Sequence, residues 1–178
     1  MGHNEPRMSY FLTFSTYGTH LLGDPRGSTH RHEGRLLPRP AYETSSRNLM
    51  KESPFRLSRL EDRQAVFEAI LEVCRYREWR LIALHVRTEH VHGLVQAEGI
   101  QPHRVMGDWK AYGSRALRKL WPDRTHFWTS GGDTRGISGS GVNAIARYIL
   151  AEQGEPMETF DATSGQIYCQ NLPTKPTN

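Results

Sequence analysis

Two histidines separated by a single residue, His90 and His92, are the side chains in this sequence best suited to chemistry. They lie in an apolar-rich run typical of a β-strand, where residues two apart share a face and are separated by roughly 7 Å. Two imidazoles at that separation can bind one metal ion. An alternative explanation is that both are polar residues on the exposed face of a strand, because alternation places polar side chains there in any case.

The second candidate is Tyr148, on a helix predicted near the end of the chain. The apolar stripe of that helix consists of Val142, Ile145, Ala146, Ile149 and Leu150. Tyr148 lies about 130° from the centre of the stripe, and Glu152 follows it by one turn on the same side. Both also have ordinary explanations, since an exposed tyrosine can pack on a neighbouring surface and a glutamate can be a solvated charge. A carboxylate at this end of a helix opposes the helix dipole, so capping does not explain Glu152.

Several elements are needed to position these side chains, and the sequence predicts most of them. Residues 79–86 and 90–96 are two apolar-rich runs joined by three polar residues, which is typical of an antiparallel hairpin. Aromatic and β-branched residues predict a first strand over residues 10–17. Ser58 and Glu61 form a capping box ahead of an apolar stripe, which predicts a helix over residues 59–77.

A second long helix is predicted over residues 102–120. One arc of this helix is apolar and comprises Val105, Trp109, Tyr112, Ala116 and Leu120. Another arc is basic and comprises Arg104, Arg115, Arg118 and Lys119. The helix is therefore expected to have a core face, which includes Trp109, and a basic face.

The remaining segments are predicted to be irregular. Residues 21–53 are expected to form a long loop with a short strand near residues 35–37, because glycines and prolines interrupt both the helical and the strand period of apolar residues. A strand is expected near residues 124–129 and a mobile glycine-rich connection over residues 131–141. Gly154 and Pro156 should stop the last helix, and residues 165–178 should form a frayed tail.

This order of elements favours an α+β sandwich, in which helices pack on one face of an antiparallel sheet. The 178 residues contain no internal repeat, so we expect one domain with a core over about residues 9–160. No apolar run approaches the roughly 18 residues of a membrane span, and the first eight residues are too polar for a secretory signal. We therefore expect a cytoplasmic protein without a membrane partner, in which Cys74 and Cys169 are reduced.

The net charge of +4 and the isoelectric point near 9.3 are mildly basic, which suggests a polyanionic partner without requiring one. The chain has no glycine-rich loop ending in Lys-Ser or Lys-Thr, so no nucleotide cofactor is expected.

Three features together resemble the HUH-type single-tyrosine transposases. They are the hairpin Leu84-His-Val-Arg-Thr-Glu-His-Val-His-Gly-Leu-Val95, the basic helix after it, and Arg147-Tyr148-Ile149 on the last helix. This family includes the insertion-sequence-200 kind and the REP-associated tyrosine transposases. The opening segment, residues 10–27, also resembles the start of bacterial members, so the resemblance spans about residues 10–154. It implies a ferredoxin-like, or RNA-recognition-like, fold.

The resemblance also implies roles for individual residues. His90 and His92 would be paired metal ligands, and Tyr148 would attack the scissile phosphate. The residue one turn after the tyrosine would complete the metal site and is usually Gln or Asn in the family. Here it is Glu152 with Gln153 beside it, and both stay candidates. The ion would be Mg²⁺ or Mn²⁺, and mixed nitrogen and oxygen ligands suit Mn²⁺ or Co²⁺ better than Mg²⁺.

The implied function is metal-dependent cleavage and transfer of single-stranded DNA through a covalent phosphotyrosine intermediate. The DNA would carry a hairpin, the protein would act at the nucleoid as a monomer or a homodimer, and residues 26–39 are one candidate DNA-binding segment. Unpaired bases could stack on Tyr17, Trp121 or Trp128. The other candidate DNA-binding residues are Arg104, Lys110, Arg115, Arg118 and Lys119, although scattered basic residues are also common on ordinary surfaces.

Three alternatives are compatible with the same residues. One is a nickase of the relaxase or replication-initiator type, which shares the chemistry but normally belongs to a larger protein. Another is a catalytically inactive protein of the same fold that binds DNA or RNA hairpins. The third is a small metallohydrolase in which Tyr148 has no role.

Overall fold

The computed structural model describes residues 8–26, 28–30 and 34–168. Its centre is a six-stranded antiparallel sheet in the order β6-β1-β5-β4-β7-β8. The strands are β1 Ser9–Ser15, β4 Arg80–Val86, β5 His90–Gln96, β6 Asp133–Ile137, β7 Glu158–Asp161 and β8 Gln166–Tyr168. The main helices are α2 Leu60–Tyr76, α3 Pro102–Leu120 and α4 Gly141–Ala151.

The first four of these strands have the ferredoxin-like arrangement. Helix α2 connects β1 to β4, a hairpin joins β4 to β5, and α3 connects β5 to β6. The strand order β6-β1-β5-β4 is that of two interleaved βαβ units. The expected α+β class with an antiparallel sheet is confirmed.

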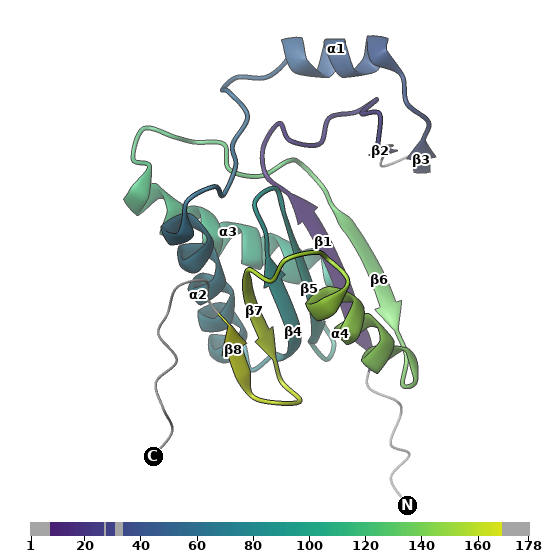
Figure 1. Cartoon of the computed structure of the whole chain (residues 1–178), viewed down its shortest axis with the longest axis vertical. Helices are drawn as coiled ribbons and strands as arrows, with labels where there is room; N and C mark the ends of the chain where they lie inside the picture. Colours follow the sequence, from purple (N-terminus) through teal and green to yellow (C-terminus); the bar gives the residue numbers. More distant parts are fainter. Residues whose placement is uncertain (1–7, 27, 31–33, 169–178) are drawn as a thin grey trace, which may run out of the picture.

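The helices lie on both faces of the sheet. Helices α2 and α3 pack together on one face, with α3 behind the sheet in Figure 1. Helix α4 contacts β4 and β5 from the opposite face and lies in front of the sheet in the same view. The expectation of helices on one face therefore describes α2 and α3 but not α4.

The two faces are built from alternate residues of the same strands. The face under α2 and α3 holds the main core, in which Leu12, Phe14, Leu84, Val91 and Trp109 are buried. Gly93 of β5 is needed for this packing, because a Cβ there would lie 2.5 Å from the Trp109 ring. The face under α4 has a smaller apolar cluster, in which Phe11, Leu94 and Ile149 are buried.

The region between β1 and α2 contains structure that the sequence does not predict. Helix α1, Pro40–Asn48, lies beyond one end of the sheet, where the expectation was a loop (Figure 1). It has no buried residue, so it lacks the apolar stripe by which a helix is predicted. Strands β2 Ser28–His30 and β3 Gly34–Leu36 pair near the expected short strand.

Three expectations for the second half of the chain are wrong. The glycine-rich segment contains β6, because the open edge of β1 supplies it with backbone hydrogen-bond partners from Ser9 to Thr13. Residues 124–129 contribute only an isolated bridge between Thr16 and Trp128. The start of the expected frayed tail is also ordered, since β8 pairs with β7, and residues 169–178 lie outside the described part.

The long helices agree with the predicted ranges but differ in detail. Helix α2 begins after Arg59 without a side-chain cap, so the predicted capping box does not form. On α3 the buried stripe is rotated from the predicted arc, because Leu117 is buried and Leu120 is exposed. Among the described residues, no helix combines the length and apolar character needed to cross a membrane.

Candidate active site

A row of polar residues crosses the sheet beneath α4. Thr13 on β1 lies opposite His92 on β5, His92 lies opposite His85 on β4, and His85 lies opposite Thr159 on β7. Directly opposite residues of antiparallel strands point to the same face. His90 lies two residues before His92, opposite Ser15, and therefore shares this face as predicted.

The two candidate ligands contact each other and are shielded from water. The ring centroids of His90 and His92 are 4.6 Å apart, and the rings are inclined by 71°. Burial is the main cause that lowers the pKa of His90 to about 4, with a contribution from Arg87. Burial, followed by repulsion from His90, lowers the pKa of His92 to about 3. Both imidazoles are therefore neutral at physiological pH, which is the form that binds metals.

The two nitrogens of His92 have different environments. Nδ1 lies 2.9 Å from the Thr13 hydroxyl oxygen, whereas Nε2 is buried and has no hydrogen-bond partner among the described residues. When Nδ1–H donates to the hydroxyl, Nε2 carries the free lone pair. A buried lone pair without a donor is unusual, and the addition of a metal ion at Nε2 would satisfy it. The residues present therefore fit a metal ion.

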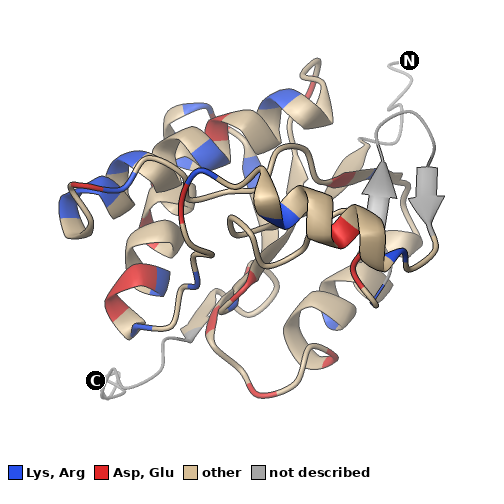
Figure 2. Cartoon of the chain, turned by 90° about the horizontal axis from the view of Figure 1, so that it is seen from above, with Lys and Arg blue, Asp and Glu red and all other residues tan. Residues whose placement is uncertain are grey.

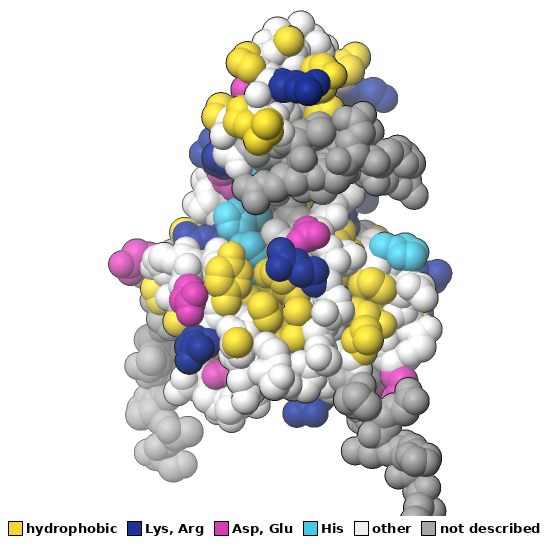
Figure 3. Space-filling model, turned by 90° about the vertical axis from the view of Figure 1, so that its right-hand side faces the viewer, with side chains coloured by type: hydrophobic (Ala, Val, Ile, Leu, Met, Phe, Trp, Pro, Cys, Tyr) yellow, Lys and Arg dark blue, Asp and Glu magenta, His cyan; other side chains and the backbone are white. Residues whose placement is uncertain are grey.

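Tyr148 faces this histidine. Its ring centroid is 6.2 Å from that of His92 and 6.1 Å from that of Phe11, and Phe11 stacks on His92 at 6.0 Å. The tyrosine remains 38% exposed, so it is also accessible from solvent. The structure thus brings together the helix tyrosine and the strand histidines, as the sequence analysis expects. Viewed from the side of β6 and α4, hydrophobic side chains gather on this face with histidines above them (Figure 3).

A third histidine holds α4 in this position. His85 is fully buried, and its Nδ1 lies 2.9 Å from the carbonyl oxygen of Ile149, the residue after Tyr148. The backbone N–H of Met157 donates to His85 Nε2 at 3.2 Å. Burial lowers the pKa of His85, which keeps its ring neutral so that one nitrogen donates while the other accepts. His85 therefore ties both ends of the turn after α4 to β4.

Neither Thr13 nor His85 is predicted from the sequence to be part of the site. A signal was present for both, because each is a polar residue within an apolar strand and falls on the alternate positions that face α4. The period assigns them to a face, but only the strand order shows that this is the face of His92.

The two candidates for a third ligand have different surroundings. Glu152 is exposed, and its carboxylate lies 3.8 Å from Arg147 Nε. Gln153 is half-buried, and its side chain interacts with His92. This interaction raises the pKa of His92 and so offsets part of the effect of burial. In the described part of the chain, no three His, Cys, Asp or Glu side chains are grouped as a metal site. Of the two candidates, Gln153 is therefore the one whose side chain interacts with His92, whereas the Glu152 carboxylate lies beside Arg147.

The candidate DNA-binding residues of α3 lie over the other face of the sheet. Basic positions recur along this helix (Figure 2). Arg104, Arg115, Arg118 and Lys119 are exposed, as expected. Arg104 pairs with Asp108 at 3.7 Å, and the Arg115 guanidinium lies 4.0 Å from the centre of the Tyr112 ring.

Lys110 differs from the other basic residues of α3. Its ammonium group donates to the carbonyl oxygens of Thr129, at 2.8 Å, and Gly131. Burial lowers the pKa of this ammonium group to about 8. Lys110 therefore holds the segment that leads into β6, and its charge is turned inward.

The aromatic candidates for base stacking already have partners. The indole N–H of Trp121 donates to Asp62 at 2.8 Å, and that of Trp128 donates to the carbonyl oxygen of Lys110 at 3.0 Å. The Tyr17 hydroxyl accepts a hydrogen bond from the Lys51 backbone at 2.9 Å. All three rings pack against the main core, as Trp109 does from within it.

The fold and the site together define a ferredoxin-like α+β domain whose sheet carries paired histidines facing a helix-borne tyrosine. Residues 49–152, more than half of the chain, match the sequence pattern of the family described as Transposase IS200 like. The chain belongs to this family of IS200-like transposases, which are DNA-cleaving enzymes.

Two solved structures are similar to the chain at low sequence identity. One is a REP-associated tyrosine transposase bound to a REP hairpin, with 14% identity and a TM-score of 0.48 over 85% of this chain and 70% of that chain. The other, from Deinococcus radiodurans R1, is named as a transposase and has 13% identity and a TM-score of 0.46 over 84% of this chain and 94% of that chain. No curated protein matches the sequence.

Proposed function

We propose that this chain cleaves and rejoins single-stranded DNA through a covalent link between Tyr148 and a DNA phosphate. The observation that supports the proposal best is the position of Tyr148, whose ring centroid lies 6.2 Å from that of His92. A tyrosine exposed enough to reach a substrate and adjacent to a buried, neutral histidine pair suits phosphoryl transfer.

His90, His92 and Gln153 are the residues that would hold a divalent ion, Mg²⁺ or Mn²⁺. The neutral imidazoles and the free Nε2 of His92 support this assignment. Such an ion, when bound, offsets negative charge on the non-bridging phosphate oxygens and orients the phosphate for in-line attack. Glu152, one turn after the tyrosine, is the alternative third ligand and would have to release Arg147.

The protein's own residues supply the nucleophile and its orientation. The Tyr148 oxygen forms a bond to phosphorus, and the deoxyribose oxygen opposite it leaves and takes up a proton. The tyrosine proton passes to solvent, which reaches the half-exposed side chain. Rejoining reverses these steps with a new strand end, and it needs no nucleotide because the phosphotyrosine bond retains the energy of the cleaved one.

Two further residues position this machinery. Thr13 orients His92 through the contact at Nδ1, so that Nε2 is left for the metal. His85 holds the backbone next to Tyr148 through the carbonyl group of Ile149. The candidate groups come together within one chain, which supports cleavage by a single protomer; exchange of α4 within a homodimer is the alternative. We propose that the substrate is hairpin-bearing DNA in the cytoplasm, at the nucleoid.

One assay tests the proposal. The protein is incubated with labelled single-stranded DNA, with and without a hairpin, in the presence of Mn²⁺, and the products are separated on a denaturing gel. We expect a covalent adduct, and mass spectrometry should place the DNA on the peptide that contains Tyr148. Binding without an adduct would favour the inactive hairpin-binding protein, and cleavage without an adduct would favour a metallohydrolase.

A further inference from the structure

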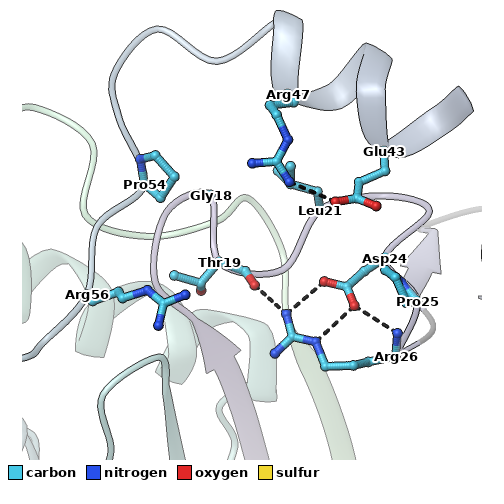
Figure 4. A pocket seen from close by; sticks show the side chains of 10 residues that line it. All are labelled: Gly18, Thr19, Leu21, Asp24, Pro25, Arg26, Glu43, Arg47, Pro54 and Arg56. Carbon is cyan, nitrogen blue, oxygen red and sulfur yellow. Dashed lines mark hydrogen bonds and ion pairs between the residues drawn. The ribbon is translucent and has the colours of Figure 1, made fainter. Parts of the chain in front are cut away.

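A hollow of about 320 Å³ lies beyond the end of β1, between α1 and the loop that follows the strand. Three arginines from three different segments line it, namely Arg26 from the loop after β1, Arg47 from α1, and Arg56 from the segment before α2 (Figure 4). We call this hollow the arginine pocket. It has no part in the proposed steps at Tyr148.

The walls of the arginine pocket are packed closely. Gly18 and Gly23 have φ values of 73° and 88°, in the region that favours glycine. A Cβ at Gly18 would lie 2.3 Å from Met50, and one at Gly23 would lie 2.4 Å from the Arg39 carbonyl oxygen. The loop after β1 is therefore held tightly against the segments that carry Arg47 and Arg56.

Arg56 itself is presented from a rigid segment. Its neighbours Phe55 and Leu57 are buried in the main core. Their backbone N–H groups each donate at 2.8 Å, from Phe55 to the Tyr17 carbonyl and from Leu57 to the Thr88 carbonyl. Because the residues on both sides are fixed, the Arg56 side chain points outward, and its guanidinium group enters the hollow (Figure 4).

The three arginines differ in how many of their N–H donors are already used in contacts within the protein. The donors of Arg26 are occupied, because it donates to Asp24 through Nε and Nη2, to the Thr19 carbonyl through Nη2, and to Glu89 through Nη1. Hydrogen bonding to Arg26 is also the main cause that lowers the pKa of Asp24 to about 2.

Arg47 and Arg56 each have one acidic partner. Arg47 contacts Glu43 at 2.7 Å through Nη2, and Arg56 contacts Glu89 at 2.7 Å through Nη1. A guanidinium group carries five N–H donors, so most donors of both residues are not used by these pairs. Their side chains are 57% and 59% exposed, which leaves these donors accessible from the hollow.

The arginine pocket is close to the candidate active site along the chain and in space. Glu89, which accepts from Arg26 and Arg56, immediately precedes His90. On the neighbouring strand, Ser15 pairs with His90, and Gly18 and Thr19 of the pocket follow three and four residues later. At the rise of a strand, this separation is on the order of 10 Å. DNA with its scissile phosphate at His90 would therefore have flanking phosphates within reach of the pocket.

We propose that Arg47 and Arg56 bind one backbone phosphate of the substrate strand, a few nucleotides from the scissile phosphate. The inference rests on the proposed function for its substrate, single-stranded DNA. The guanidinium fork matches two phosphate oxygens, and Glu43 and Glu89 hold the two forks in place before the DNA arrives. These carboxylates also limit the positive charge, so the pocket takes one phosphate and not a run of them.

Binding measurements test the inference without cleavage. Arg47→Gln and Arg56→Gln are compared with the wild-type protein for affinity to single-stranded DNA in EDTA, over a series of salt concentrations. Loss of one phosphate contact should lower the affinity roughly fivefold and reduce the slope of log K against log salt by about 0.7. Arg75→Gln, at the exposed far end of α2, is the matched control and should change neither value. Equal effects of all three variants would overturn the proposal.

Neutral methylphosphonate linkages, placed one at a time along the DNA, locate the phosphate. With wild-type protein, one linkage near the cleavage position should weaken binding. With Arg56→Gln or Arg47→Gln the same linkage should weaken binding less, because one of the two contacts to that phosphate is already lost. If no position depends on Arg56 or Arg47, the inference is wrong. A preference for free phosphate or a terminal 5′-phosphate over an internal linkage would also overturn it. These outcomes are independent of adduct formation, so failure of the proposed function is seen separately.

Discussion

The two faces of the central sheet are made by the same strands and have opposite characters. On β5, Val91 and Val95 enter the main core, whereas His90 and His92 point to the other side. On β4, Leu84 is packed beneath α2 while its neighbour His85 binds α4. Because successive residues of a strand point to opposite faces, adjacent residues can serve the stability of the core and the chemistry of the site.

The covering helices account for the difference in exposure. Helices α2 and α3 seal the core face, where Leu12, Leu84 and Val91 have no exposed surface. The shorter α4 buries only Ile149 and leaves Tyr148 38% exposed. Helix α4 covers His90 and His92 only in part. This burial lowers their pKa values enough to keep both rings neutral, but the site stays accessible to a substrate. The site face is therefore less tightly packed and more accessible than the core face. Substitutions on the site face should damage function, whereas substitutions on the core face should damage folding.

The largest expected effect is on the site face, from Tyr148→Phe. The substitution removes one oxygen from a half-exposed ring, so the fold, metal binding and DNA binding should be unchanged. We expect no detectable covalent adduct, because among the described residues Tyr148 is the tyrosine whose ring packs against His92. Tyr76→Phe, an exposed tyrosine on α2, is the control and should form the adduct normally. An adduct formed by Tyr148→Phe would show that the nucleophile is a different residue.

The second largest effect is expected from replacement of either candidate metal ligand, His90 or His92. His90→Ala or His92→Ala should weaken Mn²⁺ binding by more than ~100-fold, beyond the loss caused by an outer hydrogen-bond partner alone. Cleavage should fall with it, while single-stranded DNA binding in EDTA stays within about twofold, since the arginines that bind phosphate are elsewhere. Calorimetry or Mn²⁺ electron paramagnetic resonance measures the metal affinity. Full metal affinity in either variant would contradict the assignment.

On the core face the expected loss is in stability. Leu84→Ala removes a fully buried side chain next to His85 and should lower the free energy of unfolding by ~2–5 kcal/mol. Adduct formation per folded molecule at low temperature should be retained, because Leu84 points away from the site. Urea denaturation measures the first quantity and the adduct assay the second. If folded Leu84→Ala protein failed to form the adduct, the core face would also contribute to the chemistry, and the distinction between the two faces would be wrong.

Thr13→Val tests the hydrogen bond that orients His92. Valine has nearly the same shape but cannot accept from Nδ1, so the imidazole loses its fixed tautomer. Metal affinity should fall by about 10–100-fold, the range found when outer partners of metal ligands are removed. Thr13→Ser retains the hydroxyl and should restore most of the affinity. Equal affinities of the valine and serine variants would indicate that Thr13 only fills space.

The smallest effect concerns the stability of the metal-free protein in acid. The pKa values of His90 and His92 are lowered to about 4 and 3, whereas an unfolded histidine titrates near 6.5. In the window between these values the unfolded chain binds more protons, so the free energy of unfolding falls as the pH decreases from about 6.5 towards 4. The double variant His90→Gln/His92→Gln should have a flatter pH dependence in EDTA. An equally steep dependence would mean that other groups cause it.

Much of the fold was predictable from the sequence because strands and helices leave local periods in it. The hairpin of β4 and β5 and the bounds of α3 follow from such patterns. Elements that leave no such period could not be predicted in this way, α1 and β6 among them. Helix α1 buries no residue and so has no period, and β6 is a glycine-containing strand that depends on the free edge of β1.

The sequence alone predicts that His90 and His92 share a strand face and that Tyr148 stands off the apolar stripe of its helix, because local backbone geometry sets both relations. The packing of distant segments is needed to bring these residues face to face, to add Thr13 and His85 to them, and to place Arg47 and Arg56 around one pocket. The difference between Glu152 and Gln153 shows why. The Glu152 N–H bonds to the Tyr148 carbonyl oxygen at 3.2 Å, so Glu152 keeps the predicted place one turn after Tyr148, but its side chain is exposed and its carboxylate lies 3.8 Å from Arg147 Nε. The direction of Gln153 depends on the path of the chain towards β7, which no local period records.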